Sequence, residues 1–165
     1  MTAIDPSGPD PSGPDPSGLA DRLLIRELID AYSNVVTQRR WDLLPDLWAE
    51  DCAWRTRGSV SRDIEGKADV VAAVRAVVEG YRMVFQMPHA PRVEVDGDTA
   101  SVSVLVHELV KVDDVSGRDV FAIYHDRVVR TAQGWKFKER VFRGSYIQGK
   151  PMPGVTRHLL ADGAT

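Results

Sequence analysis

The chain of 165 residues is poor in the residues from which several kinds of site are built. Cys52 is its single cysteine, so neither an intrachain disulfide nor a cysteine-based metal cluster is possible. Its four histidines are not spaced like a metal site. The sequence also lacks a phosphate-binding glycine loop, a dinucleotide-binding GxGxxG motif and an HExxH motif. We therefore expect no metal and no cofactor.

Charge and hydropathy exclude further classes of protein. The net charge of −3 gives no basic field that would attract nucleic acid or an anionic membrane. No apolar run approaches the roughly 20 residues of a membrane helix, and the first residues contain no apolar signal-peptide core. We expect a cytoplasmic protein that binds neither nucleic acid nor membranes.

The first 18 residues differ in composition from the rest of the chain. The stretch DPSGPDPSGPDPSG has no apolar side chain to bury, so folding would not offset the entropy lost on ordering it. We predict a disordered tail over residues 1–18, one folded domain over 19–150 and a C-terminal tail or pocket lid over 151–165. His158 lies in this last segment.

Hydrophobic periodicity predicts three helices in the first half of the domain. Residues 19–38 carry a broad apolar stripe at helical spacing, and residues 41–51 give a short second helix with Pro45 near its start. Valines recur at helical spacing between Gly66 and Gly80, where Gly80 is a plausible stop. A strand is expected over residues 52–61.

After Gly80 the apolar period changes to two, which is typical of strands. The turn sequence DGD at 96–98 joins a strand that contains Val93 and Val95 to a long strand over 99–112. Two more strands are predicted over 118–131 and 135–147. The order of elements predicts an α+β fold, with helices on one face of an antiparallel-rich sheet.

Three stretches, at residues 20–55, 92–102 and 124–144, resemble the SnoaL-like branch of the nuclear-transport-factor-2-like superfamily. They read ADRLLIRELIDAYSNVVTQRRWDLLPDLWAEDCAWR, RVEVDGDTASV and YHDRVVRTAQGWKFKERVFRG. The resemblance implies a cone-shaped α+β barrel, in which three N-terminal helices wrap a strongly bent sheet around an apolar pocket. Members include dehydratases, isomerases and polyketide cyclases, so the fold alone does not define the reaction.

The resemblance also implies site residues. A tyrosine that faces the pocket falls on Tyr32, and the acidic residue late in the long strand falls on Glu108. The positions of the Asp–His dyad of the dehydratase-like members fall on Thr37 and Gln86. The chain thus keeps the tyrosine and an acid but departs from the family at the dyad.

His89 is the candidate replacement for the missing base. It shares the alternate-residue parity of Val93 and Val95, so in a regular strand it would face the cavity and could meet Glu108 across the ladder. The alternative is an ordinary surface histidine at a strand entry. His107 has the opposite parity to Glu108, but it stays a catalytic candidate because a bulge can shift parity by one.

Other residues are expected to bind substrate or to hold the sheet together. Asp126 and Arg140 should form an ion pair that holds two strands. The expected substrate-binding residues are Gln86, Thr37, Trp41, Trp54, Phe85, Tyr124 and Phe142.

These observations favour a cofactor-independent lyase or isomerase that acts by acid–base chemistry on a hydrophobic cyclic molecule, such as a polyketide, steroid or aromatic intermediate. The alternatives are a non-catalytic binding module of the same fold and the small subunit of an oxygenase. We also expect a homo-oligomer, a dimer or trimer, because Phe121, Ile123 and Val129 lie on the predicted sheet face opposite the pocket.

Overall fold

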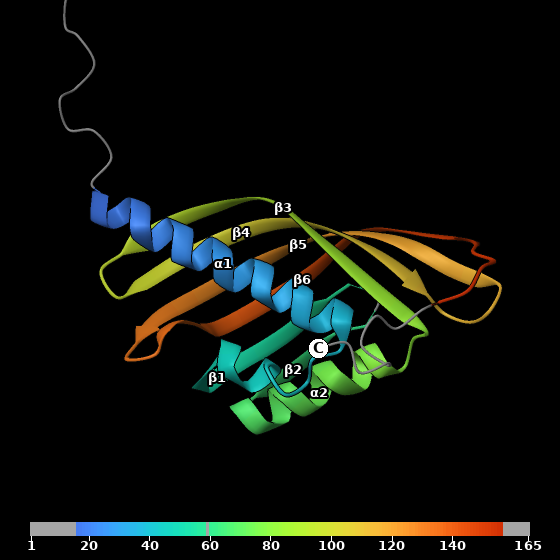
Figure 1. Cartoon of the computed structure of the whole chain (residues 1–165), viewed down its shortest axis with the longest axis horizontal. Coiled ribbons are helices and arrows are strands. Elements are labelled where there is room, and N and C mark those ends of the chain that lie inside the picture. The colour runs from blue at the N-terminus through green and yellow to red at the C-terminus, as the bar shows by residue number, and fades with distance from the viewer. Residues whose placement is uncertain (1–15, 59, 157–165) are drawn as a thin grey trace, which may run out of the picture.

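The computed structural model describes residues 16–58 and 60–156 (Figure 1). Two α-helices and one 3-10 helix accompany a single sheet of six strands, which confirms the α+β class. Most of the predicted tail, residues 1–15, and most of the predicted lid, residues 157–165 with His158, lie outside the described residues.

Helix α1 (Pro16–Gln38) begins three residues before the predicted start. Its apolar residues recur at spacings of three and four, so they form one stripe that the sheet buries. Leu24, four residues before Leu28, is 47% exposed and lies outside the buried part of the stripe. The buried side chains of the stripe are Ile25, Leu28, Ile29, Tyr32, Val35 and Val36.

The predicted second helix is wrong. Only a single 3-10 turn, η1 (Leu44–Leu47), forms there, with Pro45 at its start, and strand β1 (Trp48–Arg57) begins directly after it. Trp48 is buried against the rings of Tyr32 and Phe137 and is paired with Phe137 in the sheet. Burial of this large ring in the core overrides the local helical preference.

Helix α2 (Lys67–Glu79) follows the prediction closely. Gly66 and Gly80 flank it, and its buried residues Val70, Val74 and Val78 are those that the valine spacing indicated. Strand β2 (Arg62–Glu65), which was not predicted, pairs antiparallel with β1 just before this helix.

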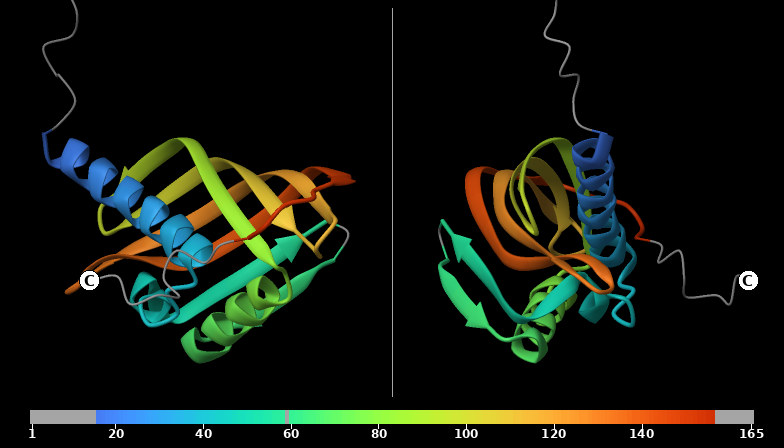
Figure 2. Two further views of the ribbon diagram at one scale, coloured as in Figure 1. Left: turned by 45° about the vertical axis from the view of Figure 1, so that its right-hand side comes forward. Right: turned by 90° about the vertical axis from the view of Figure 1, so that its left-hand side faces the viewer.

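The second half of the chain forms a meander of four long antiparallel strands. These are β3 (Met83–Asp96), β4 (Thr99–Lys111), β5 (Ser116–Thr131) and β6 (Gly134–Pro151). Strand β1 joins the meander by pairing parallel to β6, so the order across the sheet is β2-β1-β6-β5-β4-β3. Figure 2 shows that this sheet is strongly bent, as the predicted cone requires.

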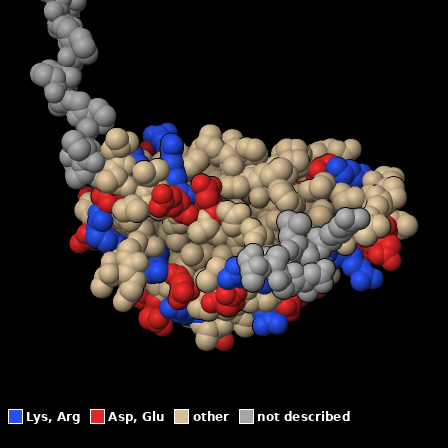
Figure 3. Space-filling view, viewed as in Figure 1, with Lys and Arg blue, Asp and Glu red and all other residues tan. Residues whose placement is uncertain are grey.

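The two helices lie against different parts of the bent sheet. Helix α1 packs mainly on β3, and α2 packs on β1, below the meander in Figure 1. Charged side chains of both signs are interspersed over the face in Figure 3. In the described part of the chain, neither helix combines the length and apolarity needed to span a membrane.

Candidate active site

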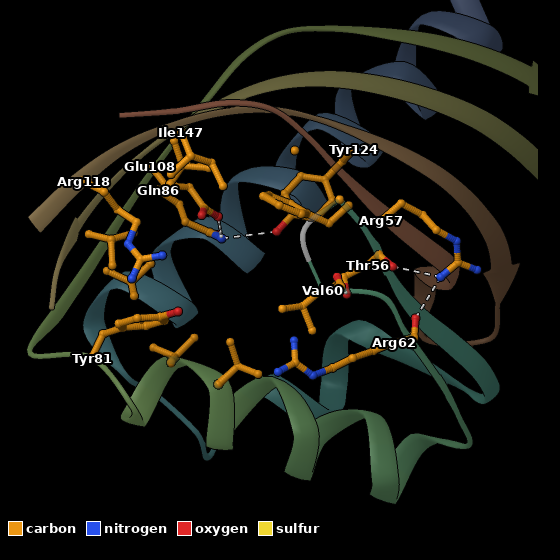
Figure 4. Close-up of a pocket in the computed structure, with 18 of the residues that line it drawn as sticks. Thr56, Arg57, Val60, Arg62, Tyr81, Gln86, Glu108, Arg118, Tyr124 and Ile147 are labelled. Carbon is orange, nitrogen blue, oxygen red and sulfur yellow. Dashed lines mark hydrogen bonds between the residues drawn. The ribbon is translucent and has the colours of Figure 1, made fainter. Parts of the chain in front are cut away.

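A pocket of about 600 Å³ opens between helix α2, the β1–β2 turn and the inner face of the sheet (Figure 4). Valines cover much of its wall, including Val74, Val78, Val84 and Val120. Its polar side chains include Gln86, Glu108, Tyr81, Tyr124 and three arginines.

Glu108 is the acidic residue that lines this pocket. It lies on β4 directly opposite Gln86 on β3, whose amide Nε2 donates a hydrogen bond of 2.6 Å to its Oε1. Burial raises the pKa of Glu108 above its ordinary value of 4.5, and the Gln86 hydrogen bond and Arg140 oppose this rise. A carboxylate with a raised pKa at a pocket wall is a stronger base than an ordinary glutamate, and once protonated it can return the proton as an acid.

Gln86 connects Glu108 to two other residues predicted for the site. Its Nε2 lies 3.3 Å from the Tyr124 hydroxyl, and its backbone N–H donates a 3.0 Å hydrogen bond to Thr37 Oγ1. The two positions that correspond to the family's dyad, 37 and 86, therefore meet in this structure. Thr37 of helix α1 fixes the backbone of Gln86, while the side chain of Gln86 lines the pocket and binds Glu108.

Tyr124 belongs both to the pocket wall and to a buried cluster behind it. The Arg140 guanidinium carbon lies 3.8 Å from the ring centre of Tyr124 and 4.1 Å from that of Tyr32. Arg140 also forms the expected ion pair with Asp126, at 3.3 Å, with both side chains almost fully buried. Burial raises the pKa of Tyr124 well above its ordinary value, so the hydroxyl acts as a neutral hydrogen-bonding group.

The placement expected for Tyr32 is wrong. This residue is 2% exposed, does not line the pocket, and packs edge-on against the rings of Trp48, Tyr124 and Phe137. Burial raises its pKa to about 12. The turn of α1 directs this ring toward Arg140, whereas Tyr124, which packs against it, reaches the pocket wall beside Gln86.

The expectation that His89 faces the cavity is also wrong. His89 is exposed and does not line the pocket. One extra residue lies on β3 between the pairs His89–Leu105 and Arg92–Ser103, and Ala90 there has a φ of 41°. This bulge reverses the inward parity along the strand, so Val93 and His89 point to opposite faces despite their even spacing.

We expect His89→Gln to leave the free energy of unfolding within about 0.5 kcal/mol of wild type, because surface substitutions away from special features have effects of this size. Urea unfolding followed by tryptophan fluorescence measures this difference. A loss above about 2 kcal/mol would contradict the exposed position of the ring.

His107 lies on the outer face of the sheet, as its parity with respect to Glu108 indicated. Its ring stacks on Phe121 at 4.4 Å, and its Nε2 lies 2.9 Å from Asp119 Oδ1. Asp119 also pairs with Lys150, and these partners lower the pKa of Asp119. His107 therefore belongs to a surface cluster on the far side of β4 from the pocket.

The remaining predicted substrate-binding residues divide among the pocket, the core and the outer face of the sheet. Trp54 and Phe142 line the pocket. Trp41 instead packs against the hydrophobic core, and Phe85 is 46% exposed on the outer face, since Val84 and Gln86 on either side of it point inward. Both of these expectations are wrong.

Sequence reasoning missed Tyr81, Arg62 and Arg118, which also line the pocket. A signal for Arg118 was present, because it shares the alternate-residue parity of Val120 and Tyr124 on β5. Arg62 gave no such signal, since its strand was not predicted. Among the described residues, no group of three or more His, Cys, Asp or Glu side chains could hold a metal ion.

The family follows from comparison with known proteins. The model of the SnoaL-like domain matches residues 17–141. An uncharacterized protein of Mycobacterium tuberculosis is 31% identical over 128 residues, which cover 74% of this chain and 84% of the relative. The chain therefore belongs to the SnoaL-like family.

Solved structures show the same fold at lower identity. A candidate scytalone dehydratase from Novosphingobium aromaticivorans superposes with a TM-score of 0.71 at 17% identity, covering 90% of this chain and 98% of its own. A hexachlorocyclohexane dehydrochlorinase from Novosphingobium barchaimii gives a TM-score of 0.70 at 23% identity, with coverage of 83% and 93%. Structural neighbours of the chain thus include proteins named for elimination reactions.

Proposed function

We propose that this protein is a cofactor-independent lyase that eliminates a small group from a hydrophobic cyclic substrate. The observation that carries the proposal is the Glu108 carboxyl group, which lies at the pocket wall with its pKa raised by burial and one oxygen held by Gln86. A base with this environment suits the removal of a proton from carbon.

The proposed reaction needs only protein groups. The Glu108 carboxylate removes a proton from a carbon next to a carbonyl group. The electron pair of that C–H bond forms a double bond to the neighbouring carbon, and the C–O bond between this neighbouring carbon and its hydroxyl group breaks. The protonated Glu108 then returns its proton to the departing hydroxyl, which leaves as water. The Gln86 amide orients the carboxylate. The Tyr124 hydroxyl, which lines the pocket, accepts a hydrogen bond from that amide, so its own proton is free to be donated to a substrate oxygen.

The pocket wall and the related proteins support this class of reaction and substrate. Side chains of Val74, Val120, Trp54 and Phe142 offer apolar contact to a ring system in a space of about 600 Å³. The names of two structural neighbours, a candidate dehydratase and a dehydrochlorinase, both describe eliminations. An isomerisation would use the same proton abstraction and end with return of the proton to another carbon.

A non-catalytic binding module is the second candidate. It is favoured by the Thr37–Gln86 pair, which stands where the family's dehydratase-like members have an Asp–His dyad. In that case the pocket would hold a ligand without changing it.

Solvent deuterium exchange distinguishes the two candidates. The protein is incubated with 1-tetralone in D₂O, and deuterium next to the carbonyl group is measured by mass spectrometry. A lyase or isomerase with a working base should accelerate the exchange above the buffer rate. Binding of 1-tetralone in calorimetry without any acceleration would reject the catalytic proposal and favour the binding module.

We also propose that the chain forms a homo-oligomer through the outer face of the meander. Phe85, Leu105 and Phe121 are each about half exposed on this face, and an apolar surface of this kind typically marks an interaction site. Sedimentation velocity at micromolar concentration should show a dimer or trimer, and Leu105→Glu with Phe121→Glu should shift it to monomer. Ser101→Glu, farther along β4, is the control. A wild-type monomer would contradict the proposal.

A further inference from the structure

The side chains that line the pocket carry more positive than negative charge. Arg57, Arg62 and Arg118 stand against the single carboxylate of Glu108, although the whole chain has a net charge of −3. Arg57 has a structural role, because it donates hydrogen bonds to the carbonyl oxygens of Thr56 and Arg62 and pairs with Asp63. Figure 4 shows its guanidinium directed away from the pocket. The other two arginines are therefore the ones that can meet a ligand.

Arg118 extends into the pocket beside Tyr81 (Figure 4). Its guanidinium carbon lies 5.6 Å from the centre of the Tyr81 ring. Within residues 16–58 and 60–156 the structure gives Arg118 no ion pair, whereas Arg55, Arg130 and Arg140 are each paired with at least one carboxylate. A partly buried guanidinium is usually matched by an anion, since its donors fit a carboxylate in a two-pronged geometry.

Arg62 approaches the same space from the opposite wall. It belongs to β2, and its side chain runs over helix α2 toward the pocket interior in Figure 4. Like Arg118, it forms no ion pair with any other residue in the described part of the chain. Two cationic groups thus flank one apolar space from different elements.

We propose that the substrate of this pocket is an organic acid whose carboxylate binds Arg118, with Arg62 adding attraction from across the pocket. This inference rests on the proposed function, since it names the substrate class of the same site. Arg118 pairs in the sheet with Val110, two residues after Glu108 on the same face of β4. Residues diagonal to each other in a ladder are near neighbours. A carboxylate at Arg118 therefore places the adjoining carbons of the ligand beside the Glu108 base.

Calorimetric titration with 2-naphthoate and 2-naphthamide tests the proposal. The two probes share a ring system and differ in charge, and neither undergoes elimination. Wild-type protein should bind 2-naphthoate about ten- to a hundredfold more tightly than the amide, the effect expected of hydrogen bonds to a charged group. Arg118→Met should remove most of this preference while leaving the affinity for 2-naphthamide unchanged.

Three further variants complete the design. Arg118→Lys keeps the charge without the two-pronged geometry and should retain part of the preference. Arg62→Met should weaken 2-naphthoate binding less than Arg118→Met, and it carries the test if the Arg118 variants fail to fold. Arg127→Met is the control: this exposed residue lies on the outer face of β5, the strand that carries Arg118, and its substitution should leave both affinities unchanged.

Equal affinity of wild-type protein for the two probes would overturn the proposal, as would a preference that survives Arg118→Met and Arg62→Met together. Neither result depends on turnover. Failure of the proposed function alone would appear differently, as 2-naphthoate binding through Arg118 without any deuterium exchange in 1-tetralone.

Discussion

Glu108→Gln should lower the rate of deuterium exchange in 1-tetralone by about 10²- to 10⁴-fold, the usual cost of removing a positioned general base. Glutamine has nearly the same shape but accepts no proton near neutral pH. Gln86 Nε2 can still donate its hydrogen bond to the new amide oxygen, so the fold and the ligand affinity should be preserved. The exchange rate and the affinity for 1-tetralone are measured on the same preparation.

The pH dependence of the wild-type exchange provides an independent test. Because burial raises the pKa of Glu108 above 4.5, the active carboxylate form is lost as the pH falls through that raised value. The rate should therefore rise with pH and level off above the raised pKa. Glu94→Gln, an exposed glutamate on β3, is the matched control and should leave the profile unchanged. An unaltered rate in Glu108→Gln would assign the proton transfer to another group.

Arg140→Met should destabilise the protein by about 3–5 kcal/mol, the range seen when one partner of a buried ion pair is removed. The substitution leaves the Asp126 carboxyl without its partner in the core, and it removes a cation that lies within 4.3 Å of the ring centres of Tyr32, Tyr124 and Phe137. Urea unfolding measures the loss. Arg75→Met, which breaks an exposed pair on α2, should cost at most about 0.5 kcal/mol.

The stability that the protein loses in Arg140→Met should be smaller at low pH than at high pH. Burial raises the pKa of Asp126 to about 7 even with Arg140 present, so the folded state binds this proton more tightly than the unfolded state does. The stability from the bound proton is complete below the unfolded pKa of about 3.8 and is lost as the pH rises through about 7. Without the opposing charge of Arg140 the pKa rises further, so the variant should lose less stability at about pH 5 than at about pH 8.

A double variant separates loss of the pair from loss of packing. Replacing both partners, Asp126→Leu with Arg140→Met, should recover much of the stability, because no charge is then left buried alone. If the double variant is as unstable as Arg140→Met, the lost contacts of Arg140 with the aromatic rings account for the effect, rather than the unpaired buried charge of Asp126.

The spacing of hydrophobic residues predicted most of the fold, because most of the long helices and strands bury the same face along their whole length. Helices α1 and α2 and strands β4 and β5 bury one regular face each, so their spacing is visible in the sequence. The second predicted helix failed because long-range packing of Trp48 overrides the helical spacing of residues 41–51. The structure of this segment depends on Phe137, which is distant in the chain and pairs with Trp48 in the sheet.

The candidate site was only partly predictable for a similar reason. Glu108 was identified because it continues the regular alternation on β4 and matches a position of the family, whereas Gln86 was identified from the family resemblance alone. His89 was misplaced because a single extra residue on β3 reverses the parity. The flanking prolines, Pro88 and Pro91, are typical of a bulge or an edge strand, but they do not define which way the parity changes. Arg62 was missed because β2 is only four residues long and is defined by its pairing with β1.

The bulge at Ala90 divides one strand between two compartments of the molecule. Before it, Val84 and Gln86 belong to the pocket, and after it Val93 and Val95 pack against the core cluster. The two halves of β3 can therefore vary under different constraints, the first set by what the pocket must accommodate and the second by the packing of a helix. Substitutions in the first half can change substrate preference while the second half keeps its packing against the core.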